Sequence, residues 1–369
     1  MNTSLLRRLG YGAAAPVLAG VIALLISSIV LAVSGSDPIE TYRIMLTNGS
    51  KLETWIDTMN RATPLLLAGI AAAIGFRMNL FNIGVEGQYR LAAFVAAVVG
   101  AEIALPGVLH VGVIVLIAMF VGALWAGLSA ILYVTRGINE VISTIMLNFV
   151  ATGGIIAGLQ PLVIDDPTAA NQSTPPLPES GWIPDLNGVV EIVTREIGKG
   201  RRLTGVFLLA LVAAVVYHIV ITRTRFGFDL RASGMNPLAA RVGGVPPKKM
   251  VIYSMLGSGA VAGLVGMPDI LSNTHAFDQG FTKGLGFAGI TVALLGRNSA
   301  PGMLVAALLF GFLDSSSAIL QVSGAASREI VVIMQATFLM VAVIAYEIVN
   351  HKRQQDDVAR AAGMTVVAS

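Results

Sequence analysis

The sequence predicts an all-α, polytopic membrane protein with about ten transmembrane helices, some of them short or broken. Of the 369 residues, 55% are hydrophobic and only 12% are charged, and the mean hydropathy is +0.78. A soluble domain carries roughly 25% charged residues, so this chain lacks the polar surface that water requires. Apolar runs close to the roughly 20 residues that cross a bilayer recur along the chain. These observations exclude a soluble enzyme and predict a multi-pass protein of the cell (cytoplasmic) membrane.

Ten hydrophobic segments define the expected spans in chain order. They cover residues 11–33, 63–76, 90–105, 111–134, 141–159, 204–221, 251–271, 287–295, 301–320 and 329–349. The second and eighth are shorter than a bilayer demands, so we expect tilted or broken helices buried among neighbours. The first segment has features of a cleaved signal peptide, but the spans that follow it favour an uncleaved helix.

The distribution of Lys and Arg predicts the orientation of these spans. An even number of spans places both termini on one side, and the basic residues are more numerous in the segments on that side. By the positive-inside rule, the N- and C-termini are cytoplasmic. The expected organisation is a transmembrane domain at residues 1–350 and a cytoplasmic tail at 351–369. Within the domain, 222–250 forms a cytoplasmic loop and 160–203 an extracytoplasmic one.

Several kinds of chemistry are excluded by the composition. The chain has no cysteine and only four scattered histidines, so no metal site and no cofactor is expected. No phosphate-binding loop of the G-x-x-x-x-G-K-[ST] type occurs, and the run Gly284-Leu-Gly-Phe-Ala-Gly289 follows no strand, so we interpret it as helix packing. The pI is about 9.3, but a net charge of +3 on loops between apolar runs does not indicate nucleic-acid binding.

The cytoplasmic loop contains a short helix with a start and a stop signal. Asn236 followed by Pro237 is an N-cap and first-turn pair, and Gly243 with Gly244 ends the helix. A small apolar face runs through Leu238, Ala239 and Val242. The loop holds six basic residues and one acid, so one interpretation is a segment resting on anionic lipid headgroups. The favoured alternative is a helix that docks into a soluble partner.

Polar residues between the second and third spans form a second unusual region. Asn82, Glu86 and Gln88 lie within residues 77–90, where Glu86 falls in the first turn of the third helix. One interpretation is a solvated turn with an Arg77–Glu86 ion pair. The other is a broken-helix element, re-entrant or not, that exposes amides to a transport path, since irregular backbone at membrane depth survives only where protein or water surrounds it.

Three further features carry open alternatives. Asp314, in the middle of the ninth span, is expected to face the bundle interior, either in a structural pair, on the translocation path, or in a proton relay. In the fifth span, Asn139 caps the helix and Asn148 faces other helices rather than lipid. The loop 160–203 holds six of the 15 prolines, so it is either a floppy connection or a contact surface for another protein outside the membrane.

The loop motif resembles the coupling segment of ABC importer permeases of the branched-chain amino acid, simple sugar and nucleoside class. The matching residues are Gly227, Arg231, Ala232, Gly234, Asn236, Ala239, Ala240 and Gly244. The runs 81–88, 139–148 and 284–296 are similar to further patterns of the same family, and 81–88 looks most like its nucleoside-type permeases. The proline at 301 stands one residue later than in many relatives. The resemblance therefore does not define the geometry of the loop before the ninth span.

The resemblance implies a non-enzymatic transport subunit that translocates nucleosides, with a simple-sugar (ribose-like) permease as the alternative. A stand-alone secondary transporter or channel is the alternative from another class. The implied partners are a second related permease, a cytoplasmic ATPase with two nucleotide-binding domains, a lipid-anchored solute-binding protein, the nucleoside and membrane lipid. The expected ATPase contacts are Arg231, Gly234, Asn236, Ala239, Ala240 and Gly244. The expected pathway residues are Asn82, Glu86, Gln88, Asn148 and Asp314.

Overall fold

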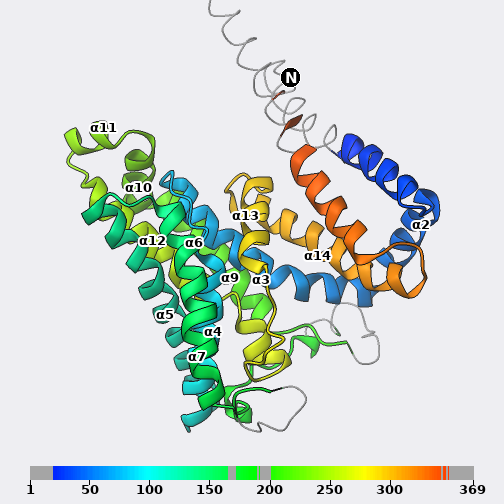
Figure 1. The fold of residues 1–369 in the computed structure, drawn as a ribbon, viewed down its shortest axis with the longest axis horizontal. Helices are drawn as coiled ribbons and strands as arrows, with labels where there is room; N and C mark the ends of the chain where they lie inside the picture. Colours follow the sequence, from blue (N-terminus) through cyan, green and yellow to red (C-terminus); the bar gives the residue numbers. More distant parts are fainter. Residues whose placement is uncertain are drawn as a thin grey trace, which may run out of the picture. The chain divides into compact units, whose positions relative to one another are not determined.

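A computed structural model describes residues 20–164, 172–188, 191, 201–341, 344, 345 and 348. Most of these residues are helical, and the β-structure found among them is confined to two isolated bridges. The chain forms two compact units (Figure 1). One contains Leu52–Phe312, and the other contains the described residues up to Lys51 together with those from Leu313 onward. The all-α prediction is therefore confirmed.

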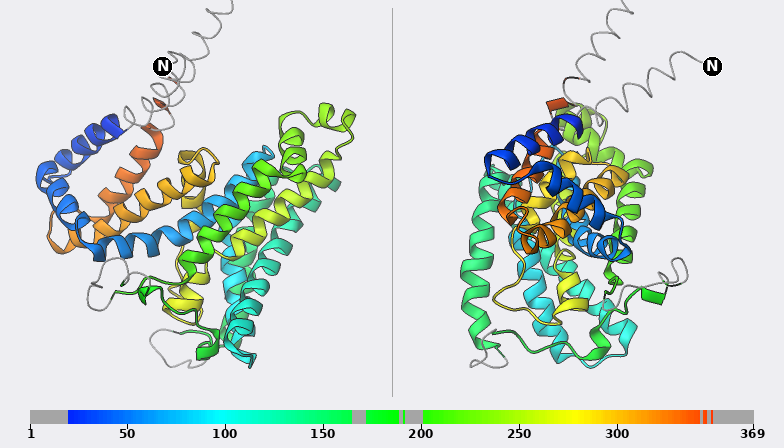
Figure 2. Two further views of the ribbon diagram at one scale, coloured as in Figure 1. Left: turned by 180° about the vertical axis from the view of Figure 1, so that it is seen from behind. Right: turned by 90° about the vertical axis from the view of Figure 1, so that its right-hand side faces the viewer.

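The larger unit is a bundle of long and short helices. Its α-helices are α3 (Leu52–Arg77), α4 (Val85–Glu102), α5 (Gly107–Arg136), α6 (Glu140–Phe149), α7 (Ala157–Leu159), α9 (Val206–Arg223), α10 (Arg225–Met235), α11 (Pro237–Val242), α12 (Pro247–Gly263), α13 (Leu285–Leu295) and the start of α14 (Ala300–Val322). Helix α5 packs against α12 and α4, while α13 and α12 pack against α3 (Figure 2). The central position of α3 explains why most of its apolar residues are buried.

Glycines allow α5 and α12 to approach backbone to backbone. A β-carbon at Gly122 would overlap the carbonyl oxygen of Gly259, and one at Gly263 would overlap the carbonyl oxygen of Ala118. In a bilayer the hydrophobic effect does not favour contacts between helices over contacts with lipid tails. Close packing of small residues is therefore a main source of helix association there. These glycines of the α5–α12 seam are therefore used for helix packing.

In the smaller unit, the first described residues form two consecutive helices. The helix Gly20–Val33 and α2 (Pro38–Gly49) meet at a bend of 120°, and Asp37 caps α2 by accepting from the amides of Ile39 and Glu40. The Tyr42 hydroxyl donates to the carbonyl of Leu24 at 3.1 Å, which ties the two helices together. A later helix runs from residue 328 to at least 341. Its Val341 packs in a small apolar cluster with Ala23.

The span predictions are confirmed for some segments and wrong for others. The second predicted span, 63–76, corresponds to α3, which begins at Leu52 and has 26 residues. The prediction that this span is short is therefore wrong. Its first turns carry polar side chains that are satisfied by residues 201–204, as when the Asn60 side chain accepts from the amide of Thr204 at 3.0 Å. The eighth segment is short, as expected, since α13 has 11 residues. The seventh segment breaks after Gly263 and resumes as the π-helix η4 (Asp269–Asn273).

Among the described residues, five helices are long and apolar enough to cross a membrane, or six if the bent pair Gly20–Val33 and α2 counts as one span. The number of about ten spans and the cytoplasmic placement of both termini stay predictions. Residues 11–19 of the first span, part of the loop 160–203, the end of the tenth span and the tail 351–369 lie outside the described residues.

The fifth span changes its helical form midway. Residues Glu140–Leu162 run as one element of 23 residues, but α6 is followed by the seven-residue π-helix η1 (Val150–Ile156), then by α7 and the 3₁₀ turn η2 (Gln160–Leu162). π-Turns are rare, appear mostly as single-turn bulges inside α-helices and are frequent at functional sites.

Candidate functional site

The polar segment between α3 and α4 folds into a buried junction. Helix α3 ends at Arg77, and Asn79 takes a left-handed conformation with φ of 59°. The amide of Leu80 then donates to the carbonyl of Gly75, which closes the turn. The chain enters α4 at Val85. Within this non-helical stretch Asn82 and Gly84 are buried, whereas Asn79 and Phe81 are exposed.

Two of the predicted amide residues pair with each other. The Asn82 and Gln88 side chains exchange hydrogen bonds of 3.0 and 2.9 Å. Asn82 also donates to the Ser258 hydroxyl at 2.8 Å, and that hydroxyl donates to the carbonyl of Ala71 in α3. Both amides are buried. The network therefore joins the turn to α3, α4 and α12.

Asn148 reaches the same junction from α6. Its side-chain oxygen accepts from the amide of Gly87 at 2.8 Å, and its nitrogen donates to the carbonyl of Ile83 at 3.0 Å. The helix holding it begins where the sequence predicts, because Asn139 accepts from the amides of Val141 and Ile142. Asn148 thus faces other helices, as expected, and the structure brings it together with Asn82 and Gln88 around the first turn of α4.

Glu86 bridges α4 to the start of α13. One carboxylate oxygen accepts from the amide of Gly284 at 2.8 Å, and the other accepts from the amide of Gly286 at 3.0 Å. The Tyr89 hydroxyl lies 3.1 Å from the first oxygen. Gly284 has φ of +86°, a conformation that glycine adopts without strain. The carboxylate therefore occupies the positive end of a helix.

Arg77 and Glu86 do not pair with each other, so that interpretation of the segment is wrong. Arg77 instead donates from Nη2 to the carbonyl of Asn298 at 2.6 Å. The Tyr217 hydroxyl of α9 donates to the same carbonyl at 2.7 Å. The pairing fails because α13 and the loop after it lie against this junction and offer each charge a partner of its own.

Asp314 belongs to the smaller unit, on the second half of α14. Its side chain is half-buried, and its carbonyl accepts from the Ser317 hydroxyl at 2.7 Å. The hydroxyl of the neighbouring Ser316 is buried without a hydrogen-bond partner within the described chain. Asp314 thus belongs to a different unit from the four candidate residues at the α4 junction.

The loop 222–250 forms the capped helix that the sequence predicts. Asn236 accepts from the amides of Leu238 and Ala239, both at 3.0 Å, and α11 ends at Gly243 and Gly244. Gly244 has φ of +83°. Figure 1 shows α11 at the end of the larger unit, beyond α12. Its Leu238 is 74% exposed and Val242 90% exposed, so this helix has an apolar face that the rest of the described chain leaves uncovered.

The other expected contact residues lie either on this exposed surface or where α10 and α11 pack on the bundle. Ala239 is exposed, whereas Ala240 is buried. Arg231 lies on α10, a helix that the sequence did not predict, and donates to the carbonyl of Ile221 at the end of α9. A β-carbon at Gly234 would lie 2.8 Å from the backbone of Arg77 and Met78. Arg231 and Gly234 thus hold α10 on the bundle and connect α11 to the α3–α4 junction.

The described part of the loop 160–203 is held in place by hydrogen bonds. Amides of Thr174, Leu177 and Ile183 donate to carbonyls of the segment 271–277 at 2.7 to 3.0 Å. The Trp182 ring stacks on His275 with ring centroids 4.0 Å apart. Burial lowers the pKa of His275 below its ordinary value. Residues 172–188 therefore do not form the floppy connection that was one of the two interpretations.

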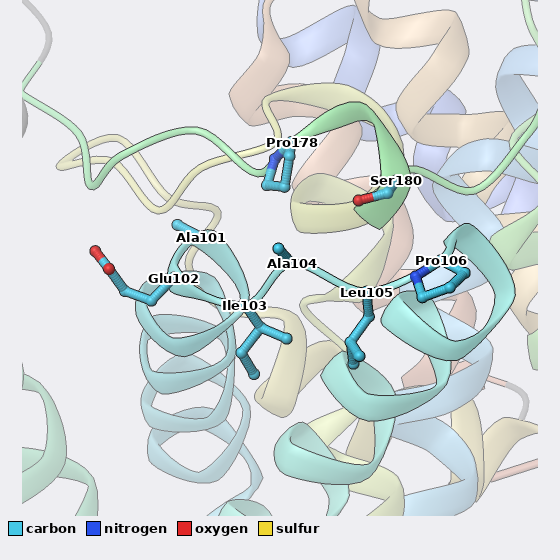
Figure 3. A pocket seen from close by; sticks show the side chains of 8 residues that line it. All are labelled: Ala101, Glu102, Ile103, Ala104, Leu105, Pro106, Pro178 and Ser180. Atoms are coloured by element: carbon cyan, nitrogen blue, oxygen red, sulfur yellow. The ribbon is translucent and has the colours of Figure 1, made fainter.

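An open pocket of about 430 Å³ lies between the end of α4, the start of α5 and residues Pro178 and Ser180 (Figure 3). The ring nitrogens of the buried His110 lie 2.8 Å from the Ser180 hydroxyl and 2.9 Å from the carbonyl of Gly100, so this histidine fastens the loop to α4. The lining contains none of the predicted pathway residues.

Sequence reasoning missed the partners of the polar residues. Ser258, Tyr217 and Gly286 lie far along the chain from the groups they contact, and no local pattern connects them. Tyr89 was missed as well, but a local signal for it exists, because it follows Glu86 by three residues and therefore lies on the same face of the helix.

Comparison with known proteins assigns this architecture to a family. Residues 55–344 match the family described as branched-chain amino acid transport system / permease component. The chain is 32% identical over 337 residues to a glucose ABC transporter permease protein of Haloferax volcanii, covering 90% of this chain and 87% of the relative. It is 32% identical over 336 residues to a guanosine ABC transporter permease protein of Bacillus subtilis, covering 90% and 93%.

A nucleoside ABC transporter permease protein of Lactococcus lactis is 30% identical over 343 residues, covering 89% of this chain and 90% of the relative. No solved structure matches the chain. With a family match over most of its length and several apolar helices, this chain belongs to the branched-chain amino acid transport system / permease component family and is a multi-pass permease of the cytoplasmic membrane.

Proposed function

We propose that this chain is one permease subunit of an ABC importer that translocates nucleosides, in which a separate ATPase supplies the energy. The observation that carries the substrate is the similarity, along about nine tenths of the chain, to permeases named for guanosine and for nucleosides. Bacillus subtilis and Lactococcus lactis each have two related permease proteins of this kind. This supports a second permease as the partner of this chain.

The geometry of α11 supports an ATP-driven rather than a stand-alone mechanism. A six-residue helix is unstable on its own in water, yet here it is capped by Asn236 and presents Leu238 and Val242 to solvent. An apolar face of this kind is typical of a contact with another protein. We propose that it binds a cytoplasmic ATPase with two nucleotide-binding domains, and that a lipid-anchored solute-binding protein delivers the nucleoside to the opposite face.

The amides at the α4 junction suit an uncharged solute. A sugar or a base presents hydrogen-bond groups without net charge, so translocation requires no acid or base chemistry. We propose Asn82, Gln88 and Asn148 as pathway residues that exchange their present hydrogen bonds for contacts with the solute. Alanine at one of them is expected to change the uptake rate with little change in protein level, since a single net hydrogen bond contributes about 0.5–1.5 kcal/mol. Loss of folded protein in all three variants would identify them as structural.

A sugar remains the second candidate solute, because the glucose permease protein of Haloferax volcanii is as similar as the guanosine one. The test is uptake into vesicles that contain both permeases, the ATPase and the binding protein, with ATP inside. We expect labelled guanosine to enter, excess unlabelled nucleoside to compete, and glucose or ribose not to compete. Glucose uptake that nucleosides leave unchanged would replace the nucleoside proposal by the sugar one.

Asp314 distinguishes the importer from a proton-coupled transporter. A carboxylate that carries protons must change charge in each cycle. An amide in its place cannot do so, but it keeps the shape of the carboxyl group and most of its hydrogen bonds. Asp314→Asn is therefore expected to retain substantial ATP-dependent uptake that a collapsed proton gradient does not affect. Transport by the chain alone, driven by a pH difference and lost in this variant, would overturn the importer proposal.

A further inference from the structure

Helix α13 is too short to cross a bilayer, so at least one of its ends must be satisfied by protein. Its 11 residues span about 16 Å, roughly half of a 30 Å hydrocarbon layer. Each helix end leaves backbone groups without partners inside the helix, and lipid offers none. The sequence of α13 is almost entirely apolar, so its own side chains cannot cap it.

The N-terminal end of α13 is capped by a side chain from a distant part of the chain. Glu86 accepts from the amides of Gly284 and Gly286 with one carboxylate oxygen each, at 2.8 and 3.0 Å. The carboxylate is buried. Its negative charge faces the positive end of the helix, where it is stabilised. The Tyr89 hydroxyl, 3.1 Å away, completes its surroundings.

The C-terminal end is held by a positive charge. After Gly296 the chain takes two left-handed residues, Arg297 and Asn298, with φ of 55° and 51°. The amide of Asn298 then returns to the carbonyl of Ala293 at 2.8 Å. The Asn298 carbonyl accepts from Arg77 at 2.6 Å. A guanidinium thus stands at the negative end of the helix.

The two charges come from the two sides of one turn. Arg77 is the last residue of α3 and Glu86 lies in the first turn of α4. Between these ends, α13 packs directly on α3, since a β-carbon at Gly289 would lie 2.5 Å from that of Ala68. Neither charged side chain binds the other, although they are near in sequence, because each has a partner at an opposite end of α13.

We propose that Arg77 and Glu86 are positioning residues that clamp α13 at both ends to the α3–α4 turn, so that α13 moves with this turn during transport. The clamp also gives a physical reason for two charged residues beside a buried turn. The inference goes beyond the proposed function and holds for any solute, because it concerns how the helices are held together. Gly234 of α10 packs on the backbone of the same turn, which places the clamp next to the foundation of α11.

Amide hydrogen exchange tests the clamp directly, in purified permease in lipid nanodiscs. Glu86→Gln keeps the shape but removes the charge and one acceptor, so exchange at Gly284 and Gly286 should rise at least about tenfold. Arg77→Gln should raise exchange selectively at residues 296–299. A matched control should leave both regions unchanged. Glu102→Gln alters an exposed carboxylate on the same helix as Glu86.

Transport supplies the second readout. If α13 must be held in place, both clamp variants should lower the maximal uptake rate with little change in the half-saturating solute concentration, and Arg77→Lys should restore part of it. Where Glu86→Gln does not yield folded protein, Arg77→Gln and Arg77→Lys carry the test alone. Exchange that is unchanged at both ends, or that rises equally in α5 and α12, would overturn the clamp. Vesicles of unaltered protein that take up no nucleoside would overturn the proposed function and leave the exchange result standing.

Discussion

The exposed face of α11 yields a prediction whose size follows from the structure. In the double variant Leu238→Ala/Val242→Ala, three carbons and two carbons are removed from side chains that are 74% and 90% exposed in this chain. At about 0.8 kcal/mol for each buried CH₂ group, scaled by those exposed fractions, full burial in a partner would contribute roughly 1.8 and 1.4 kcal/mol. Losing both should weaken binding of the ATPase by about 3 kcal/mol, on the order of 100-fold in Kd.

The assay is a titration of the ATPase against permease in nanodiscs, with thermal unfolding as the check on folding. Val108→Ala is the matched control, because Val108 is also 90% exposed but lies at the start of α5, far along the bundle from α11. We expect normal unfolding temperatures in all variants and weakened binding only in the α11 variant. Equal affinities for the α11 variant and the unaltered chain would refute the reasoning, and loop 222–250 would then be a membrane-surface segment.

Three further predictions address the cap, the glycine seam and the outer stack. Asn236→Ala should cost α11 about 1 kcal/mol through its lost N-cap, seen as faster amide exchange at residues 237–242, whereas Asn236→Asp should not. Gly122→Ala should destabilise the protein by about 1–3 kcal/mol by overpacking the α5–α12 seam, while Gly112→Ala in the same helix, with open space around the added carbon, should leave the unfolding temperature unchanged. Because burial lowers the pKa of His275, the state with this segment released binds more protons, so lowering the pH below about 6.5 should loosen residues 172–188. Amide exchange at Leu177 measures this, and a persistent pH dependence in His275→Asn would assign it to another group.

Local signals predicted the local features of this fold. The Asn236-Pro237 pair, the stop at Gly243 and the Asn139 cap each depend on residues within one helical turn, so the sequence alone suffices to find them. The apolar runs located the long helices for the same reason. The start of α3 was misplaced because its first turns carry Glu53, Asp57 and other polar residues, which are typical of a loop when their distant partners are unknown.

Distant contacts set the limit of prediction at the α4 junction. Glu86 and Gly284 are separated by 198 positions, and Asn82 and Ser258 by 176. Glu86 lies in the first turn of α4, so the sequence indicated that its carboxylate would lie near the amides at the start of a helix. In the structure these amides belong to α13 and not to α4. Helix α2 was missed because its 12 residues mix polar and apolar side chains after a 120° bend.

The π-helical turn at Val150–Ile156 gives the fifth span a phase shift along its axis. In an α-helix each residue advances about 100°, and hydrogen bonds that reach one residue further delay this rotation. The surface of α6 that carries Asn148 and the surface of α7 are therefore out of phase, and a single helical-wheel projection of the span assigns one of them to the wrong side. Deleting Gly153, where an added β-carbon would meet open space, should let the turn close as α-helix while everything from Ala157 onward keeps its present orientation, because the delayed rotation of the π-turn makes up for about one residue. A chain of this family could thus gain or lose a single residue at this turn without exchanging the neighbours of either half of the span.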